Sequence, residues 1–230
     1  MEGMGLYLIL SIPALLLGMF AQARVKSAYA KWSAVANRRG MTGADAAESM
    51  LAREGVRDVV IEPVDGFLTD HYDPAAKVLR LSPEVFSGRS VAALGIACHE
   101  AGHALQHANG YGALTLRSWL VPTAKIGSWL AVPLIGIGFA MGQLGLAKIG
   151  VLLFGLIVLF QLVTLPVEFN ASSRAKQALT NNGVTVPDED DGVGEVLNAA
   201  ALTYVAAAVS AISQLLYYVM IIAGNSRNRE

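Results

Sequence analysis

The chain has 230 residues, of which 54% are hydrophobic and only 15% are charged, and its formal net charge is −1. Its mean hydropathy of +0.48 is too high for an ordinary soluble domain and predicts several membrane spans. The near-neutral charge, without a basic run that carries interleaved aromatic residues, gives no reason to expect a nucleic-acid partner. The single cysteine excludes an intrachain disulfide framework.

Four apolar segments are long enough to cross the hydrocarbon core of a bilayer, which takes about 20 helical residues. We therefore expect transmembrane helices over residues 4–23, 119–141, 149–167 and 197–223. The first segment could instead be a cleaved signal peptide, because Ala21-Gln22-Ala23 resembles a cleavage site. No positive charge precedes it, whereas several basic residues follow it, so we interpret it as a retained anchor.

The basic flank after the first span predicts that the N-terminus lies outside the cell and residues 24–117 lie in the cytoplasm. Four spans then place residues 168–196 in the cytoplasm as well, and the C-terminus outside. Arg174 agrees with this topology, whereas Arg227 is mildly contrary to it. The expected location is the plasma membrane of a bacterium, with any site built from these two segments facing the cytoplasm.

Small residues let membrane helices pack closely. We expect five glycines to let the second and third spans pack closely, namely Gly136, Gly138, Gly142, Gly150 and Gly155.

Residues 24–117 predict an α+β insert between the first and second spans. Thr42 and Asp45 have the spacing of a capping box, and Ser82-Pro83 is typical of a helix start. The predicted elements are a helix over 43–54, a strand over 56–63, a β-hairpin of 67–72 and 77–81, a short helix from Ser82, and a long helix over 90–109. The acidic run 188–191 predicts the solvated start of the last helix.

The long helix carries Cys98-His99-Glu100-Ala101-Gly102-His103. One helical turn separates His99 from His103, so both imidazoles leave the same face and can hold one metal ion. Zinc suits neutral imidazole ligands, and Glu100 would lie beside the open position where a bound water needs a base. The competing interpretation is a surface helix with solvated histidines. Cys98 points away from this face, and we expect it to be a small buried residue.

A catalytic zinc ion takes a third protein ligand. Asn109 stands where the longer metzincin motif has its third histidine, which excludes that class. His107 lies about 12 Å along the helix from His99, too far to share one ion, so we expect it to contact a ligand, face the substrate or be exposed. Glu168 directly follows the third span, where a short helix could return it toward the motif and complete a set of two histidines and one glutamate.

The chain resembles the YugP-type integral-membrane neutral zinc metallopeptidases, which are distantly similar to the HtpX and CAAX prenyl proteases. Five segments in the same order carry the resemblance. They are Gly40-Met41-Thr42-Gly43, Leu68-Thr69-Asp70-His71-Tyr72-Asp73-Pro74, His99 to His107, Pro166-Val167-Glu168-Phe169-Asn170-Ala171-Ser172, and Leu197-Asn198-Ala199-Ala200-Ala201-Leu202-Thr203-Tyr204.

The resemblance implies one zinc ion per chain, bound by His99, His103 and Glu168, with Glu100 as the catalytic base. Ser172 departs from the wider group, whose members often carry an aspartate there. Asn170 or Ser172 could therefore support a zinc-bound histidine. His71, Tyr72 and Tyr204 are candidates for stabilising the oxyanion or contacting the substrate.

The predicted protein is a mainly α-helical membrane protein with a zincin-like α+β insert. The predicted activity is that of a zinc-dependent endopeptidase, in which zinc-activated water and a glutamate base hydrolyse peptide bonds of membrane or membrane-proximal proteins. Strand 77–81 could bind an extended peptide at its edge. The expected partners are these protein or peptide substrates and the lipid bilayer. Self-association or binding to a membrane partner protein is also compatible with the sequence. The alternatives are a catalytically silent scaffold that retains a zinc site, or a hydrolase of other substrates.

Overall fold

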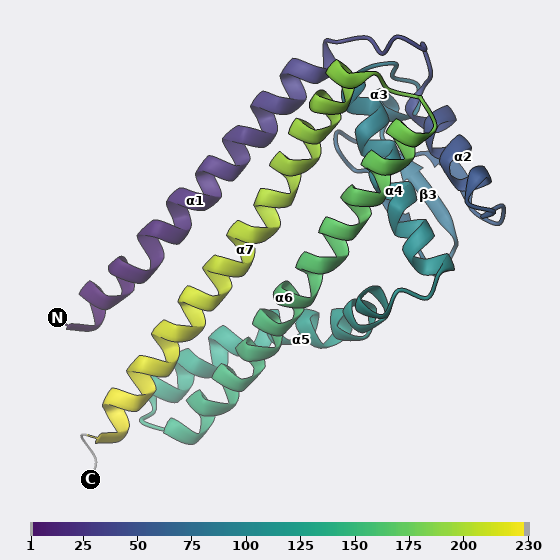
Figure 1. Ribbon diagram of the computed structural model, residues 1–230. Helices are drawn as coiled ribbons and strands as arrows, with labels where there is room; N and C mark the ends of the chain where they lie inside the picture. The colour runs from purple at the N-terminus through teal and green to yellow at the C-terminus, as the bar shows by residue number, and fades with distance from the viewer. Residues whose placement is uncertain (1, 228–230) are drawn as a thin grey trace. The chain divides into compact units, whose positions relative to one another are not determined.

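The computed structural model describes residues 2–227, and this part of the chain forms seven helices and three strands. Figure 1 traces the chain from the N-terminus to the C-terminus. The helices are α1 (Glu2–Ser33), α2 (Gly43–Arg53), α3 (Pro83–Phe86), α4 (Val91–Ala108), α5 (Gly112–Ala140), α6 (Leu144–Asn181) and α7 (Pro187–Arg227). The strands are β1 (Val60–Pro63), β2 (His71–Asp73) and β3 (Val78–Leu81). The chain divides into two compact units, and α1, α6 and α7 each contribute to both.

The first unit contains the apolar parts of the four long helices. It is built from the chain up to Ala21, from Thr115–Leu165, and from Thr203 onward. Within the described residues, four helices are long and apolar enough to cross a membrane, namely α1, α5, α6 and α7. The prediction of a mainly helical protein with four long apolar helices and a small sheet is confirmed.

Two of the five glycines expected between the second and third spans make close helix contacts. A Cβ atom on Gly138 would lie 2.5 Å from the backbone nitrogen of Ala147, and one on Gly150 would lie 2.8 Å from the carbonyl oxygen of Ala131. Gly142 instead forms the turn between α5 and α6, with φ +66°. The prediction was wrong for Gly136 and Gly155, which face open space.

The second unit consists of Gln22–Leu114 and Pro166–Leu202. Its local structure follows from the helix caps in the sequence. The Thr42 hydroxyl accepts a bond from the Asp45 backbone, and the Asp45 carboxylate accepts one from the Thr42 backbone, so the predicted capping box starts α2. The Ser90 hydroxyl accepts a single bond from the Ala93 backbone and caps α4, and Asn109 ends this helix. Buried apolar side chains of α2, β3 and α4, including Met50, Leu79 and Leu94, form its core.

The small sheet has the strand order β1-β3-β2. β3 pairs in parallel with β1 and antiparallel with β2, so the predicted hairpin is present. The prediction that strand 77–81 offers a free edge was wrong, because β3 is hydrogen-bonded on both sides. The sheet edges belong to β1 and β2.

Glu168 lies within a continuous helix, although the sequence suggested a separate short helix after the third span. α6 runs without interruption from Leu144 to Asn181 and includes Pro166. A proline within a helix removes one backbone hydrogen bond but does not always end the helix. The change from apolar to polar residues near 168 marks a change of surroundings and not of backbone conformation.

The acidic start of α7 follows Pro187, as expected, but it is not fully solvated. Glu189 is buried, and its carboxylate accepts hydrogen bonds from the backbone N–H groups of Arg38 (2.7 Å) and Val186 (3.1 Å). Asp190 accepts bonds from the hydroxyl groups of Thr180 and Thr185. These carboxylates therefore stabilise the packing of the linker after α1 and the turn before α7.

Candidate metal centre

Helix α4 presents both motif histidines on one face. Their ring centroids lie 4.9 Å apart and their planes are nearly perpendicular. His103 is buried, and His99 is only slightly exposed. This is the arrangement that the four-residue spacing predicts.

Glu168 of α6 completes a compact donor cluster with these histidines. Its Oε2 atom lies 3.2 Å from Nε2 of His99 and 3.6 Å from Nε2 of His103. One potential ligand atom from each residue lies within 4.8 Å of the others, so the three could hold a metal ion. Two imidazole nitrogens and one carboxylate oxygen are a known donor set for catalytic zinc, and the residues present therefore fit this ion.

The approach of α6 to α4 depends on Gly102. A Cβ atom at this position would lie 2.7 Å from the carbonyl oxygen of Ala171 and 3.2 Å from its Cα. Ala171 is itself buried and has the smallest side chain that still packs. Since Gly102 precedes His103 and Ala171 is three residues after Glu168, this contact brings the two ligand-bearing helices together.

A neighbouring polar side chain orients each histidine. The Nδ1 atom of His103 lies 3.0 Å from Oε1 of Gln106, and that of His99 lies 3.1 Å from Oγ of Ser172. The Gln106 amide nitrogen donates to the carbonyl oxygen of Val167 (2.8 Å), which leaves its oxygen to accept from His103. A proton on Nδ1 of both histidines then leaves their Nε2 atoms free to bind a metal ion.

Gln106 is the functional residue that the sequence analysis did not single out. It is completely buried, and its amide nitrogen also donates to Oδ1 of Asn170 at 3.0 Å. Its position three residues after His103, on a helix, could have indicated the contact. Of the two residues expected to support a histidine, Ser172 contacts His99 directly, whereas Asn170 acts on Gln106.

Glu100 lies on α4 beside His99 and is partly buried. Burial raises the pKa of its carboxyl above the ordinary value, although the neighbouring His99 and His103 oppose this change. A raised pKa makes the carboxylate a better proton acceptor.

The remaining predicted residues lie outside the cluster. The hydroxyl of Tyr72 on β2 lies 2.9 Å from Nδ1 of His107, which links the sheet to the last turn of α4. His71 is exposed and contacts the carbonyl oxygen of Thr69. Tyr204 lies on α7 in the first unit and is half-buried.

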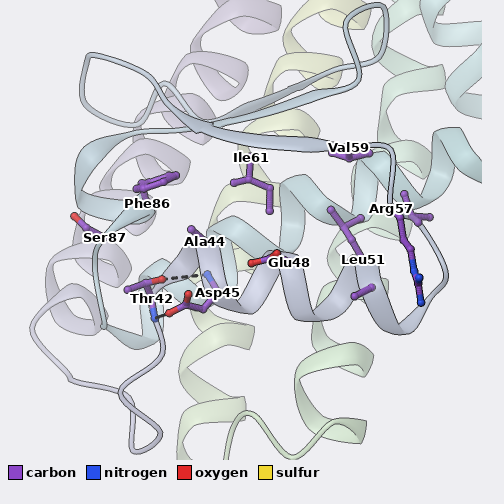
Figure 2. Close-up of a pocket in the computed structure, with 12 residues that line it drawn as sticks. Thr42, Ala44, Asp45, Glu48, Leu51, Arg57, Val59, Ile61, Phe86 and Ser87 are labelled. Atoms are coloured by element: carbon purple, nitrogen blue, oxygen red, sulfur yellow. Dashed lines mark hydrogen bonds between the residues drawn. The ribbon is translucent and has the colours of Figure 1, made fainter.

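A large cavity occurs elsewhere in the second unit. It has a volume of about 660 Å³ and lies between α2, β1 and the end of α3. Figure 2 shows Ile61 pointing from β1 toward α2, near Glu48, with Phe86 at one end. None of the three metal-cluster residues lines this cavity, so the donor chemistry, and not the size of a cavity, identifies the candidate centre.

The contact between Gly102 and Ala171 gives a test of the helix approach. We expect Gly102→Ala to lower the free energy of unfolding by about 1–3 kcal/mol, because the new methyl group overpacks against backbone. Zinc content should fall as well, since Glu168 is displaced. Gly95→Ala on the same helix is the matched control, because its Cβ would meet Val193 at an ordinary 3.4 Å. Thermal unfolding and metal analysis of both purified variants measure these two quantities. Equal stability and equal zinc content of the two variants would contradict this account.

The role of Gln106 is tested by Gln106→Leu, which removes the acceptor for His103. Loss of such a partner commonly lowers metal affinity about 10–100-fold, and we expect this loss in competition with a chromophoric zinc chelator. Gln177→Leu is the control, because Gln177 is exposed and its side chain donates to Ser173, away from the histidines. Equal zinc affinity of the two variants, with both folded, would mean that Gln106 does not orient the ligand.

Comparisons with known proteins agree with this geometry. Residues 7–223 match the family described as "Putative neutral zinc metallopeptidase". The chain is 50% identical over 216 residues to the "Putative membrane protease YugP" of Bacillus subtilis (strain 168), which covers 94% of this chain and 96% of that protein. No solved structure matches the chain. The chain therefore belongs to the neutral zinc metallopeptidase family, as the sequence motifs predicted.

Proposed function

We propose that the protein is a membrane-embedded zinc endopeptidase that hydrolyses peptide bonds of membrane or membrane-proximal proteins. The observation that carries this proposal is the cluster of His99, His103 and Glu168, with Glu100 next to it on α4. A purely structural zinc site usually has four protein ligands and needs no base. Three donors and an adjacent carboxylate favour catalysis over a silent scaffold.

The mechanism divides the work between the metal ion and the chain. When bound, zinc polarises a water molecule and the substrate carbonyl and lowers the pKa of that water. Glu100 accepts the proton of the attacking water and returns it to the leaving amine. Gln106 and Ser172 hold the two imidazoles so that their Nε2 atoms face the centre.

The sheet offers an edge for an extended peptide. β2 is an edge strand, and Tyr72 connects it to His107 on α4. We propose β2, and not the central β3, as the strand that a substrate would extend by main-chain hydrogen bonds. Its three residues make this a short edge, so side-chain contacts must supply part of the binding. Proline at Tyr72 with unchanged cleavage would contradict this role.

The charge pattern supports a site that faces the cytoplasm. With this topology, the turn between α5 and α6 lies outside the cell. A membrane-impermeant maleimide added to intact cells should label Gln143→Cys at once, and Ser87→Cys only after permeabilisation. The reverse pattern would place the site outside. Both positions are exposed, and the native Cys98 is buried, so labelling reports on the new cysteines.

Glu100→Gln tests catalysis directly. We expect cleavage of an unfolded protein such as casein by the reconstituted enzyme to fall about 10²–10⁴-fold, because the proton acceptor is lost. Zinc content should remain near the wild-type level, since Glu100 is not among the donors. Glu48→Gln, at an exposed carboxylate on α2, should leave the rate unchanged. A fully zinc-loaded Glu100→Gln protein that cleaves at the wild-type rate would refute the mechanism.

A further inference from the structure

The connection between β1 and β2 brings two adjacent large apolar side chains to the surface. The exposed fraction of Phe67 is 62%, and that of Leu68 is 40%. Their immediate neighbours Gly66 and Thr69 carry no charge. In water this tip would leave apolar area exposed that folding could have buried.

The backbone of this loop has an unusual conformation at Leu68, one of the two exposed residues, and at Gly66 just before them. Leu68 has φ +54°, in the left-handed region that residues with a side chain rarely adopt, and Gly66 has φ +114°. The Thr69 hydroxyl donates to the carbonyl oxygen of Asp65 at 3.2 Å and closes the loop. An exposed leucine in an unfavourable backbone conformation costs free energy, so some interaction of the loop must offset this cost.

The loop tip lies beside the helix that leaves the first candidate span. The rings of Phe67 and Tyr29 make an edge-to-face contact, with centroids 5.4 Å apart and an interplanar angle of 87°. Tyr29 follows the end of the apolar run at Ala23 by six residues, or about 9 Å of helix. The headgroup layer on each side of the hydrocarbon core is about 5–8 Å deep. The contact with Tyr29 therefore places Phe67 close to the outer limit of the headgroup layer, on the side where α1 leaves the apolar run.

The cationic residues of α1 before Tyr29 suit a lipid surface, whereas Glu84 and Asp70 place negative charge near the Tyr29 hydroxyl. Lys26 lies one turn nearer the span, on the same face of α1 as Tyr29, and it is exposed. Arg24 is also exposed, one half-turn before Lys26. Cationic side chains at this depth attract lipid phosphate groups, and aromatic rings are favoured in the same layer.

We propose that the loop of residues 64–70 is a membrane-surface anchor that inserts Phe67 and Leu68 into the lipid interface beside α1. The occupant of this apolar tip is lipid, not a protein partner. Because the loop leads directly into β2, the contact also fixes the height of this edge strand above the bilayer. The anchor depends neither on bound zinc nor on hydrolysis.

Site-directed spin labelling tests the anchor in the full-length protein. Phe67→Cys is labelled with a nitroxide, which is itself apolar, and reconstituted into nanodiscs of zwitterionic and anionic phospholipid. Native Cys98 is completely buried, so the wild-type protein should remain unlabelled. Val60→Cys is the control, because Val60 is 59% exposed and lies at the far end of β1 from the loop. Leu68→Cys provides a second labelled position.

Collision rates with oxygen, which concentrates in lipid, and with a water-soluble nickel chelate give the depth of each label. We expect nickel collisions at positions 67 and 68 to be several-fold fewer than at 60, and oxygen collisions to be more frequent. The same result is expected after zinc is removed, which separates this test from that of catalysis.

Two outcomes would overturn the proposal. Nickel collisions at 67 and 68 as frequent as at 60 would show that the tip lies in water. Spin–spin broadening between labels at 67, lost on dilution with unlabelled protein, would show that a second copy covers the tip.

Discussion

The close contact between α4 and α6 is the constraint on which the candidate centre depends. Neither helix has a complete donor set, because the histidines come from one and Glu168 from the other. The absence of a side chain at Gly102 lets the backbone at Ala171 come close enough for the carboxylate to reach both imidazoles. A metal ion would add attraction between the helices, but the packing already brings its donors together.

Buried hydrogen bonds make this contact specific. Gln106 bonds to His103 on its own helix and to two residues of α6, so one side chain controls both the ligand and the register of the helix pair. A buried amide with unmet hydrogen bonds costs more free energy than one that is satisfied. Relative sliding of the helices would break these bonds, and this penalty opposes displacement of the metal donors.

The sequence predicted those features that depend on residues close together in the chain, such as helix caps and the spacing of the histidines. Thr42 and Ser90 started their helices as expected, and the spacing of His99 and His103 gave their common face. Glu168 became a ligand candidate through its place after the third span and through family resemblance, because 65 residues separate it from His103 and no short-range pattern joins them. The order of the strands and the role of Gln106 depend on tertiary packing, which no local motif records.

The continuity of α6 has a mechanical consequence for the centre. Successive residues of a helix differ by about 100° in direction, so inserting or deleting one residue between the apolar part and Glu168 would turn the carboxylate away from the histidines. The helix is continuous through Pro166. The number of α6 residues between the apolar part and Glu168 therefore sets the direction in which the metal ligand leaves the helix.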